Sequence, residues 1–187
     1  MSWGDRKARA GGSRWIAVLG LGRYGTSLAG ELMRRGEEVL ALDHDPGVVQ
    51  RLTDELTHTA TVDTTDRDAL RQLDVHHCAR AVVGIGSDLE ASVLTAAVLV
   101  DFGIPNIWAK ATSRPHASIL ERIGVHHVVL PEFDMGERTA HLVAGRMLDY
   151  VEFDEDFAMI KSATPPDLAG RSLSEAALRR RRGITVV

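Results

Sequence analysis

Three glycines near the start of the chain have the spacing of a phosphate-binding turn. In WIAVLGLGRYGTSLAGEL (15–32) an apolar run ends at Gly20, and an apolar helical pattern follows Gly25. In a turn of this kind the first glycine permits the tight bend, and Gly22 lets the backbone approach a pyrophosphate. Gly25 would let the helix that starts at Tyr24 pack close to the strand, with the phosphates at its positive end. The spacing therefore predicts a nucleotide site.

An acidic residue stands where such a site needs one. The motif asks for a carboxylate about 20 residues further on, and Asp43 ends the next apolar run. Its carboxylate would accept hydrogen bonds from both ribose hydroxyls and would repel a 2′-phosphate, which disfavours NADP. NAD, ATP, ADP and AMP all carry free ribose hydroxyls, so the motif leaves the choice among them open.

Further polar residues follow the other expected strands, at the edge where ligands of open α/β sheets bind. Asp63 could accept a hydrogen bond from an adenine amino group. Arg23, inside the turn, could clamp additional phosphate charge, because a guanidinium binds anions in a bidentate manner. The candidate nucleotide-contacting residues are Gly20, Gly22, Arg23, Tyr24, Gly25, Asp43, His44, Asp63, Thr64, Gly86, Ser87, Lys110 and Glu132.

Short β-type runs alternate with helical patterns along most of the chain. Strands are expected at 15–19, 38–42, 58–62, 81–85, 106–109 and 127–130, and helices at 24–35, 46–56, 66–73, 89–102 and 115–123. Strict alternation with short loops predicts an α/β fold of the Rossmann type, with a doubly wound parallel sheet.

The pattern changes after Leu130. One more amphipathic helix is expected at Asp134–Asp149, followed by two strand-like segments around an acidic turn, a short helix at Leu173–Arg180 and a strand in GITVV (183–187). We expect a flexible tail at 1–14, a Rossmann domain at 15–133, a crossover helix at 134–150 and the start of a small C-terminal α+β lobe at 151–187.

Composition narrows the functional class. The net charge of −4 gives no general attraction to nucleic acid, and no run approaches the roughly 20 apolar residues that cross a bilayer. The single cysteine, Cys78, indicates a reducing compartment. The N-terminal residues lack the apolar core of a signal peptide. A cytoplasmic location is expected.

Other conspicuous residues have ordinary interpretations. The pairs His76-His77 and His126-His127 precede strands, opposite the nucleotide edge and without a second spaced ligand, so structural or surface roles are expected. Cys78 is interpreted as a small buried hydrophobe. The run Arg179–Arg182 suits the negative end of a helix.

An enzyme is not expected. A dehydrogenase needs a second domain with a hydride-transfer site, and the residues after the sixth strand hold no nucleophile–base pairing. The nucleotide is better explained as a signal, which requires two states that bind it differently. A fragment or divergent member of a NAD-dependent oxidoreductase is the alternative.

At the level of whole motifs the chain resembles the RCK family, also called TrkA-N or KTN, which regulates potassium transport. The resemblance rests on VLGLGRYG (18–25), EVLALDHDP (38–46), TVDTTD (61–66), VVGIGSDLEASVLTA (82–96), IPNIWAKA (104–111) and ERIGVHHVVLPEFDMG (121–136). The closest resemblance is to subunits of Ktr- and Trk-type uptake systems. The gating domain of a potassium channel or of a cation/proton antiporter is a related alternative.

The resemblance implies more than the spacing does. It implies dimers formed through the helix 134–149, an octameric ring beneath a membrane potassium transporter, and a peripheral place on the inner face of the membrane. It implies that ATP and ADP, or NAD(H) in some members, bind and change the ring's shape. It also implies that Arg23 reaches the γ-phosphate, partly across a subunit boundary, and that Glu132 helps to hold a divalent cation such as Mg²⁺ on the phosphates.

Overall fold

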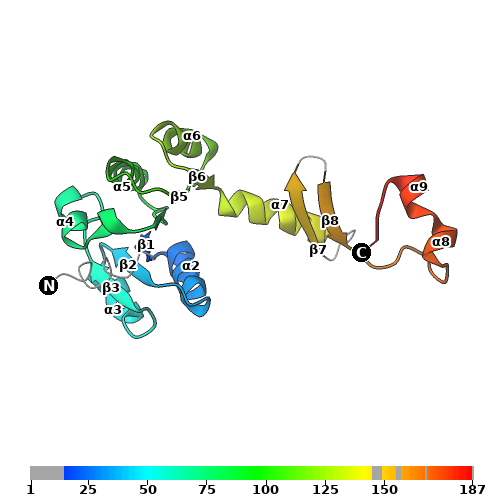
Figure 1. Ribbon diagram of the computed structural model, residues 1–187, viewed down its shortest axis with the longest axis horizontal. Helices are drawn as coiled ribbons and strands as arrows, with labels where there is room; N and C mark the ends of the chain where they lie inside the picture. The colour runs from blue at the N-terminus through cyan, green and yellow to red at the C-terminus, as the bar shows by residue number, and fades with distance from the viewer. Residues whose placement is uncertain (1–14, 145–148, 155–156, 167, 187) are drawn as a thin grey trace. The chain divides into compact units, whose positions relative to one another are not determined.

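The computed structural model describes residues 15–144, 149–154, 157–166 and 168–186, in two compact units, Met1–Glu132 and Phe133–Val187 (Figure 1). The predicted tail at 1–14 and residues 145–148 of the predicted crossover helix lie outside the described residues. Among the described helices, none combines the length and the apolar character needed to cross a membrane.

A six-stranded parallel sheet forms the centre of the first unit. Its strands are β1 (Ile16–Leu19), β2 (Val39–Asp43), β3 (His58–Thr61), β4 (Arg80–Val83), β5 (Ile107–Lys110) and β6 (His127–Val129). The strand order is β3-β2-β1-β4-β5-β6, and every neighbouring pair is parallel. This order reverses direction between β1 and β4, which is the arrangement of the Rossmann fold. The predicted fold class is confirmed.

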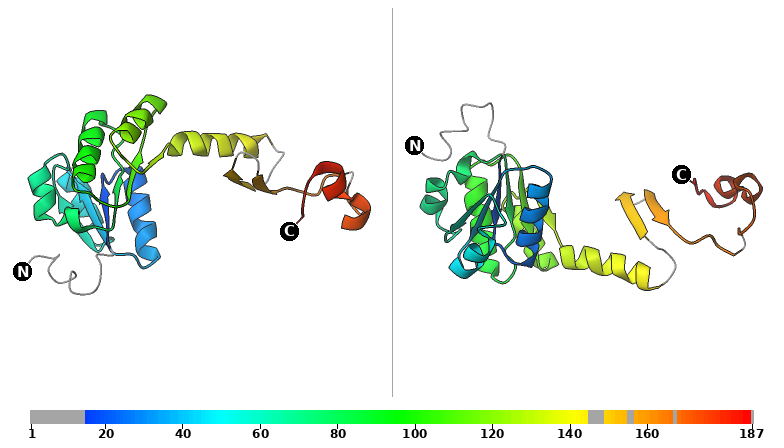
Figure 2. Two further views of the ribbon diagram at one scale, coloured as in Figure 1. Left: turned by 45° about the horizontal axis from the view of Figure 1, so that its top comes forward. Right: turned by 90° about the horizontal axis from the view of Figure 1, so that it is seen from below.

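Helices cover both faces of this sheet, as Figure 2 shows. They are α2 (Arg23–Arg34), α3 (Pro46–Leu52), α4 (Arg67–Gln72), α5 (Leu89–Asp101) and α6 (Arg114–Arg122), with a 3₁₀ turn, η2 (Val75–His77), before β4. α2 and α3 pack on one face, and α4, α5 and α6 pack on the other. Because both faces are covered, β1 is a continuous apolar run: Ile16 and Val18 contact one layer, and Ala17 and Leu19 the other.

One helix of the first unit is shorter than expected. α3 ends at Leu52 instead of Leu56, although Leu56 is buried. The hydroxyl of Thr53 donates a hydrogen bond to the carbonyl of Val49 (2.9 Å). Threonine is a poor helix former and here bonds back to the preceding turn, so the chain leaves the helix while the apolar pattern continues.

The second unit contains a helix and a hairpin. Helix α7 (Pro131–Val143) begins at Pro131 instead of Asp134, since proline is favoured at the first helical position. The predicted end of this helix at Asp149 is wrong, because Asp149 begins β7 (Asp149–Asp154). The two strand-like segments expected here are β7 and β8 (Phe157–Lys161), and the structure shows that they pair antiparallel.

The last described segment departs from prediction in two ways. The helix expected at Leu173–Arg180 is divided into α8 (Leu173–Ala176) and α9 (Leu178–Arg182) by Ala177, whose φ of 46° is left-handed. Residues 183–186 form no strand, and neither β7 nor β8 pairs with them. The strand expected in GITVV is therefore not found in the described part of that segment.

Candidate functional site

A cavity of about 790 Å³ lies at the carboxyl ends of the strands of the first unit. Its volume is in the range of small-molecule sites. All of the candidate residues line it except Tyr24 and Gly25: the lining includes Gly20, Gly22, Arg23, Asp43, His44, Asp63, Thr64, Gly86, Ser87, Lys110 and Glu132. The topology therefore brings the sequence-predicted residues together around one space.

The three glycines of the β1–α2 turn differ in what surrounds them. Gly20 has a φ of +94°, and a Cβ there would lie 2.7 Å from Cγ1 of Ile85. A Cβ on Gly25 would overlap the carbonyl oxygen of Gly20. Both glycines are required by the protein's own packing. Gly25 does not line the cavity, so its role is the close helix–strand contact that the motif assigns to it.

Gly22 is different, because nothing in the protein requires a glycine there. Its φ is −66°, which any residue adopts, and a Cβ added to it would meet nothing within 4 Å. Gly22 lines the cavity and is the N-cap of α2, where no side chain accepts a hydrogen bond from the first N–H groups. Open space beside uncapped N–H groups at the positive end of a helix suits an anionic group, so the turn fits a nucleotide's phosphates.

Asp43 stands at the end of β2 and holds this turn by hydrogen bonds. One carboxylate oxygen accepts a hydrogen bond from the N–H of Leu21 (2.6 Å), and the other accepts from the N–H of Asp45 (2.9 Å). Asp43 is 7% exposed. His44, beside it, places Nδ1 3.2 Å from the carboxylate and leaves most of its side chain exposed. Besides lining the cavity, Asp43 is thus a structural support of the glycine turn.

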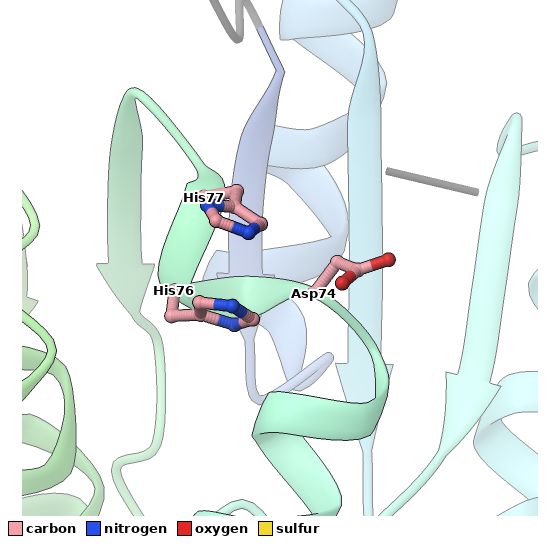
Figure 3. Close-up of side chains that lie close together, drawn as sticks. All are labelled: Asp74, His76 and His77. Carbon is pink, nitrogen blue, oxygen red and sulfur yellow. The ribbon is translucent and has the colours of Figure 1, made fainter. Parts of the chain in front are cut away.

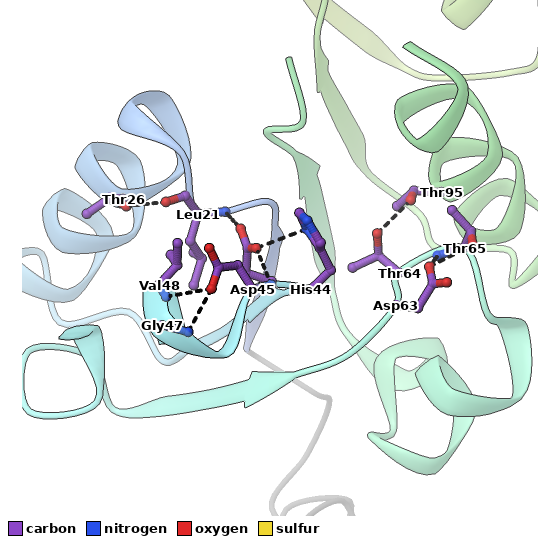
Figure 4. Close-up of polar contacts among 11 residues, drawn as sticks. Leu21, Thr26, His44, Asp45, Gly47, Val48, Asp63, Thr64, Thr65 and Thr95 are labelled. Atoms are coloured by element: carbon purple, nitrogen blue, oxygen red, sulfur yellow. Dashed lines mark hydrogen bonds and ion pairs between the residues drawn. The ribbon is translucent and has the colours of Figure 1, made fainter. Parts of the chain in front are cut away.

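The loop after β3 forms another wall. One Asp63 oxygen accepts hydrogen bonds from the N–H (2.9 Å) and the hydroxyl (2.7 Å) of Thr65, and these bonds lower the pKa of Asp63. The buried hydroxyl of Thr64 shares a hydrogen bond with that of Thr95 on α5 (2.8 Å; Figure 4). Asp63 is therefore held ionised and in one position, and Thr64 ties the loop to α5.

An ion pair lies at the β5 side of the cavity. Lys110 donates a hydrogen bond to Glu132 in the first turn of α7 (2.6 Å), and this bond is the main cause of the lowered pKa of Glu132. The charge of Arg23 lowers it further. Lys110 also lies 5.9 Å from the centre of the Tyr24 ring, within the range of a cation–π contact. Tyr24 therefore contributes through Lys110 and not as part of the cavity lining.

The absence of a side chain at Gly86 leaves space for the ammonium group of Lys110. A Cβ on Gly86 would lie 3.3 Å from Lys110 Nζ, so a larger residue would press on the ammonium group. The neighbouring Ser87 also lines the cavity.

Sequence reasoning missed part of the lining. The residues that it did not select include an apolar group, formed by Leu21, Val48, Ile85, Ala91 and Leu94, and the polar or small residues Asp45, Gly84, Glu90 and Thr112. Leu21, Asp45, Gly84, Ile85 and Thr112 could have been found by position, since they lie in the glycine turn or follow β2, β4 and β5 closely. Val48 lies in α3, and Glu90, Ala91 and Leu94 lie in α5, where the spacing of strand ends gives no signal. The lining carboxylates, on Asp43, Asp45, Asp63, Asp88, Glu90 and Glu132, outnumber the cationic groups of Arg23 and Lys110.

Comparison with known proteins gives this site a family. The sequence model of the TrkA-N domain matches residues 16–131, which contain the whole sheet and almost the whole cavity. The chain belongs to the TrkA-N domain family. It is 36% identical over 173 residues to the Ktr system potassium uptake protein C of Bacillus subtilis (strain 168), an alignment that covers 92% of this chain and 78% of that protein.

Solved structures share the fold of this TrkA-N domain. The GsuK channel bound to NAD superimposes with a TM-score of 0.70 at 16% identity, over 97% of this chain and 35% of that one. The Kef CTD of Shewanella denitrificans in its AMP bound form gives a TM-score of 0.61 at 22% identity, over 70% of this chain and 82% of that one. At these identities the likeness concerns the fold.

The remaining candidates of the TrkA-N domain lie away from the cavity. His126 Nδ1 accepts a hydrogen bond from the N–H of Ile107 (3.1 Å), and His127 stacks on Trp108 with ring centroids 4.2 Å apart. Both have the structural roles expected of them. Cys78 is buried, and burial raises the pKa of its thiol to about 12, so it is inert as a nucleophile and packs as a hydrophobe.

Proposed function

We propose that this chain is a regulatory subunit of a potassium uptake system, and that it binds an adenine nucleotide as a signal. The observation that carries the proposal is the open position at Gly22, beside uncapped helix N–H groups, in a turn whose other two glycines are required by packing. The likeness to a Ktr potassium uptake protein over most of both chains supports the part of the proposal that concerns potassium uptake.

The cavity is lined by both apolar and charged side chains. Leu21, Val48 and Leu94 contribute apolar surface that suits an adenine ring, and we propose that Asp43, which lines the same cavity, contacts the ribose. Arg23 and Lys110 supply the positive charge for phosphates. ATP, ADP and NAD(H) share the adenosine part, so we propose ATP or ADP as the ligand, with NAD(H) as the alternative, and discrimination at the phosphate end.

The excess of carboxylates favours a cation with the phosphates. A nucleotide brings several negative charges to a lining that is already acidic, and a divalent ion would neutralise part of that charge. Glu132 lines the cavity, pairs with Lys110 and is affected by the charge of Arg23, which supports the proposal that it helps to hold Mg²⁺ beside the phosphates.

The Lys110–Glu132 ion pair could couple ligand binding to helix α7. A terminal phosphate near Arg23 and Lys110 would compete with Glu132 for the lysine, because both are anions that need the same donor. Glu132 belongs to the first turn of α7, so loss of this ion pair would change how that helix starts. We infer that ATP and ADP bias α7 differently, as a nucleotide-dependent gate requires.

Assembly is proposed on the same helix. Phe133, Met135 and Val143 on α7 are 54%, 57% and 81% exposed, and no described residue of α7 is buried. An apolar helix surface of this kind is typical of a protein–protein interface. We propose that helix 134–149 forms a homodimer, that dimers close into an octameric ring, and that the ring contacts a membrane potassium transporter on the cytoplasmic side.

Calorimetric titration of the purified chain tests the nucleotide part. ATP, ADP, NAD and NADH are titrated with and without Mg²⁺, against wild type and Arg23→Ala. If Arg23 contacts the third phosphate, its loss should weaken ATP by about 10–100-fold, corresponding to a charge-assisted hydrogen bond of about 1.5–3 kcal/mol, and leave ADP little changed. Equal losses for both nucleotides would contradict the clamp. Sustained oxidation of NADH with a carbonyl substrate would instead favour an oxidoreductase.

A further inference from the structure

Three potential metal ligands gather in the turn between α4 and β4. Asp74, His76 and His77 bring one carboxylate oxygen and two imidazole nitrogens within 4.8 Å of one another. Figure 3 shows the three side chains gathered at this turn. The two imidazole rings lie 3.9 Å apart between centroids. We propose that these three side chains form a binding site for a divalent transition-metal ion, with Zn²⁺ as the representative ion, separate from the nucleotide cavity.

The backbone explains why the sequence did not reveal this site. Asp74 has a left-handed φ of 60° and is the N-cap of the 3₁₀ turn η2, so the chain reverses sharply just before the two histidines. Aspartate tolerates this conformation better than most residues. The turn brings the carboxylate to the imidazoles, which a search for widely spaced ligands does not detect.

The donor set suits a borderline metal ion. Zn²⁺ binds imidazole nitrogen and carboxylate oxygen at similar distances, and three protein ligands leave a position for water. All three ligands come from four consecutive residues, so one short turn supplies the whole set. Oxygen-only ions such as Mg²⁺ would leave both imidazoles unused.

An independent observation points to a missing partner at this place. Nδ1 of His76 is buried and has no hydrogen-bond partner, which is costly for a polar atom. The His76 ring packs edge-on against Phe102, with centroids 5.9 Å apart. A bound ion would give the imidazole the partner that it lacks.

The second histidine pair provides an internal comparison. His126 already accepts a hydrogen bond from the N–H of Ile107, and His127 is stacked on Trp108. Among the described residues, only Asp74, His76 and His77 form a group of three or more such ligands. Two adjacent histidines are therefore not sufficient, and the added carboxylate distinguishes the proposed site.

Zinc titration of the full chain after chelator treatment tests the proposal. Wild type should bind one Zn²⁺ with an affinity that falls at least about tenfold in Asp74→Asn and in His76→Ala. Asparagine tolerates the left-handed backbone, so Asp74→Asn removes the charge with little strain. His127→Ala, the matched control, should bind as wild type does. Zn²⁺ should also raise the unfolding temperature of wild type and His127→Ala, and not that of His76→Ala.

Three outcomes would overturn the site: no stoichiometric binding by wild type, wild-type affinity in Asp74→Asn, or an equal loss in His127→Ala. His77→Gln covers the case in which His76→Ala fails to fold, because His77 is exposed and its replacement leaves the core intact. That variant should also lose at least about tenfold in zinc affinity. Nucleotide titration of each variant should match wild type, which separates this test from that of the proposed function.

Discussion

Replacing Gly22 by alanine should separate binding from folding. Its φ of −66° is accessible to alanine, and the new Cβ would meet no protein atom within 4 Å. Alanine is a poorer N-cap than glycine, but it also reduces the freedom of the unfolded chain by about 0.4–1 kcal/mol. These effects oppose each other, so the free energy of unfolding should change by less than about 1 kcal/mol.

The effect on the ligand should be much larger. The added methyl group points into the space beside the first N–H groups of α2, where the phosphates would lie. Displacing the phosphates from one such N–H group loses a hydrogen bond to a charged partner, about 1.5–3 kcal/mol. That corresponds to a loss of about 10–100-fold in affinity for every nucleotide that uses the turn.

Two matched variants complete the experiment, with calorimetry for nucleotide affinity and thermal unfolding for stability. Gly30→Ala lies in the same helix, meets nothing within 4 Å and should stabilise the protein by up to about 1 kcal/mol with unchanged affinity. In Gly25→Ala the new Cβ would overlap the carbonyl oxygen of Gly20, so the free energy of unfolding should fall by about 1–3 kcal/mol or more. Wild-type nucleotide affinity in Gly22→Ala would refute the placement of the phosphates. A stability loss as large as that of Gly25→Ala would refute the claim that only a ligand requires this glycine.

Three further outcomes follow from the hydrogen bonds and the burial described above. Asp43→Asn should lower the free energy of unfolding by about 1.5–3 kcal/mol in denaturant titrations without nucleotide. The reason is that an amide has one acceptor oxygen and cannot accept from the N–H groups of both Leu21 and Asp45, as the carboxylate does. Unchanged stability would show that these bonds are not formed. Asp45→Ala removes the N-cap of α3 and should cost about 1 kcal/mol by the same measurement, whereas Asp45→Asn should cost little. Burial holds the pKa of His116 below its ordinary 6.5, so the unfolded chain binds a proton there that the native chain does not, and stability is lost as the pH falls below 6.5. In His116→Gln the fall in unfolding temperature between about pH 7.5 and 5.5 should be smaller, and an equal fall would contradict this assignment.

Most of the first unit was predictable because its signals are local and repeated. Buried parallel strands are continuous apolar runs, and glycine follows several helices at positive φ, as at Gly36, Gly103 and Gly124. The errors arose where the periodicity of the apolar residues and the backbone disagree. Leu56 is buried although α3 has already ended, and Ala177 adopts a left-handed conformation that nothing in its residue type indicates.

The site was predictable to the extent that strand ends are predictable. Asp43 and Lys110 are the last residues of β2 and β5, so the sheet itself places them at the edge where the cavity lies. What the sequence did not reveal are relations between side chains: the bond from Leu21 to Asp43, the pair that Lys110 forms with Glu132, and the meeting of Asp74 with two histidines. Each depends on backbone turns and rotamers that no spacing rule specifies.

The hydrogen bond from Leu21 to Asp43 has a consequence for how such a sensor would respond in a cell. The protein's own hydrogen bonds already hold the turn in shape, so the binding surface is preorganised. The adenosine part of every nucleotide would therefore gain the same affinity from it. At nucleotide concentrations well above the dissociation constants, competing nucleotides would then displace one another at a site that stays filled. Under those conditions the output follows the ratio of the competitors and is insensitive to their total concentration.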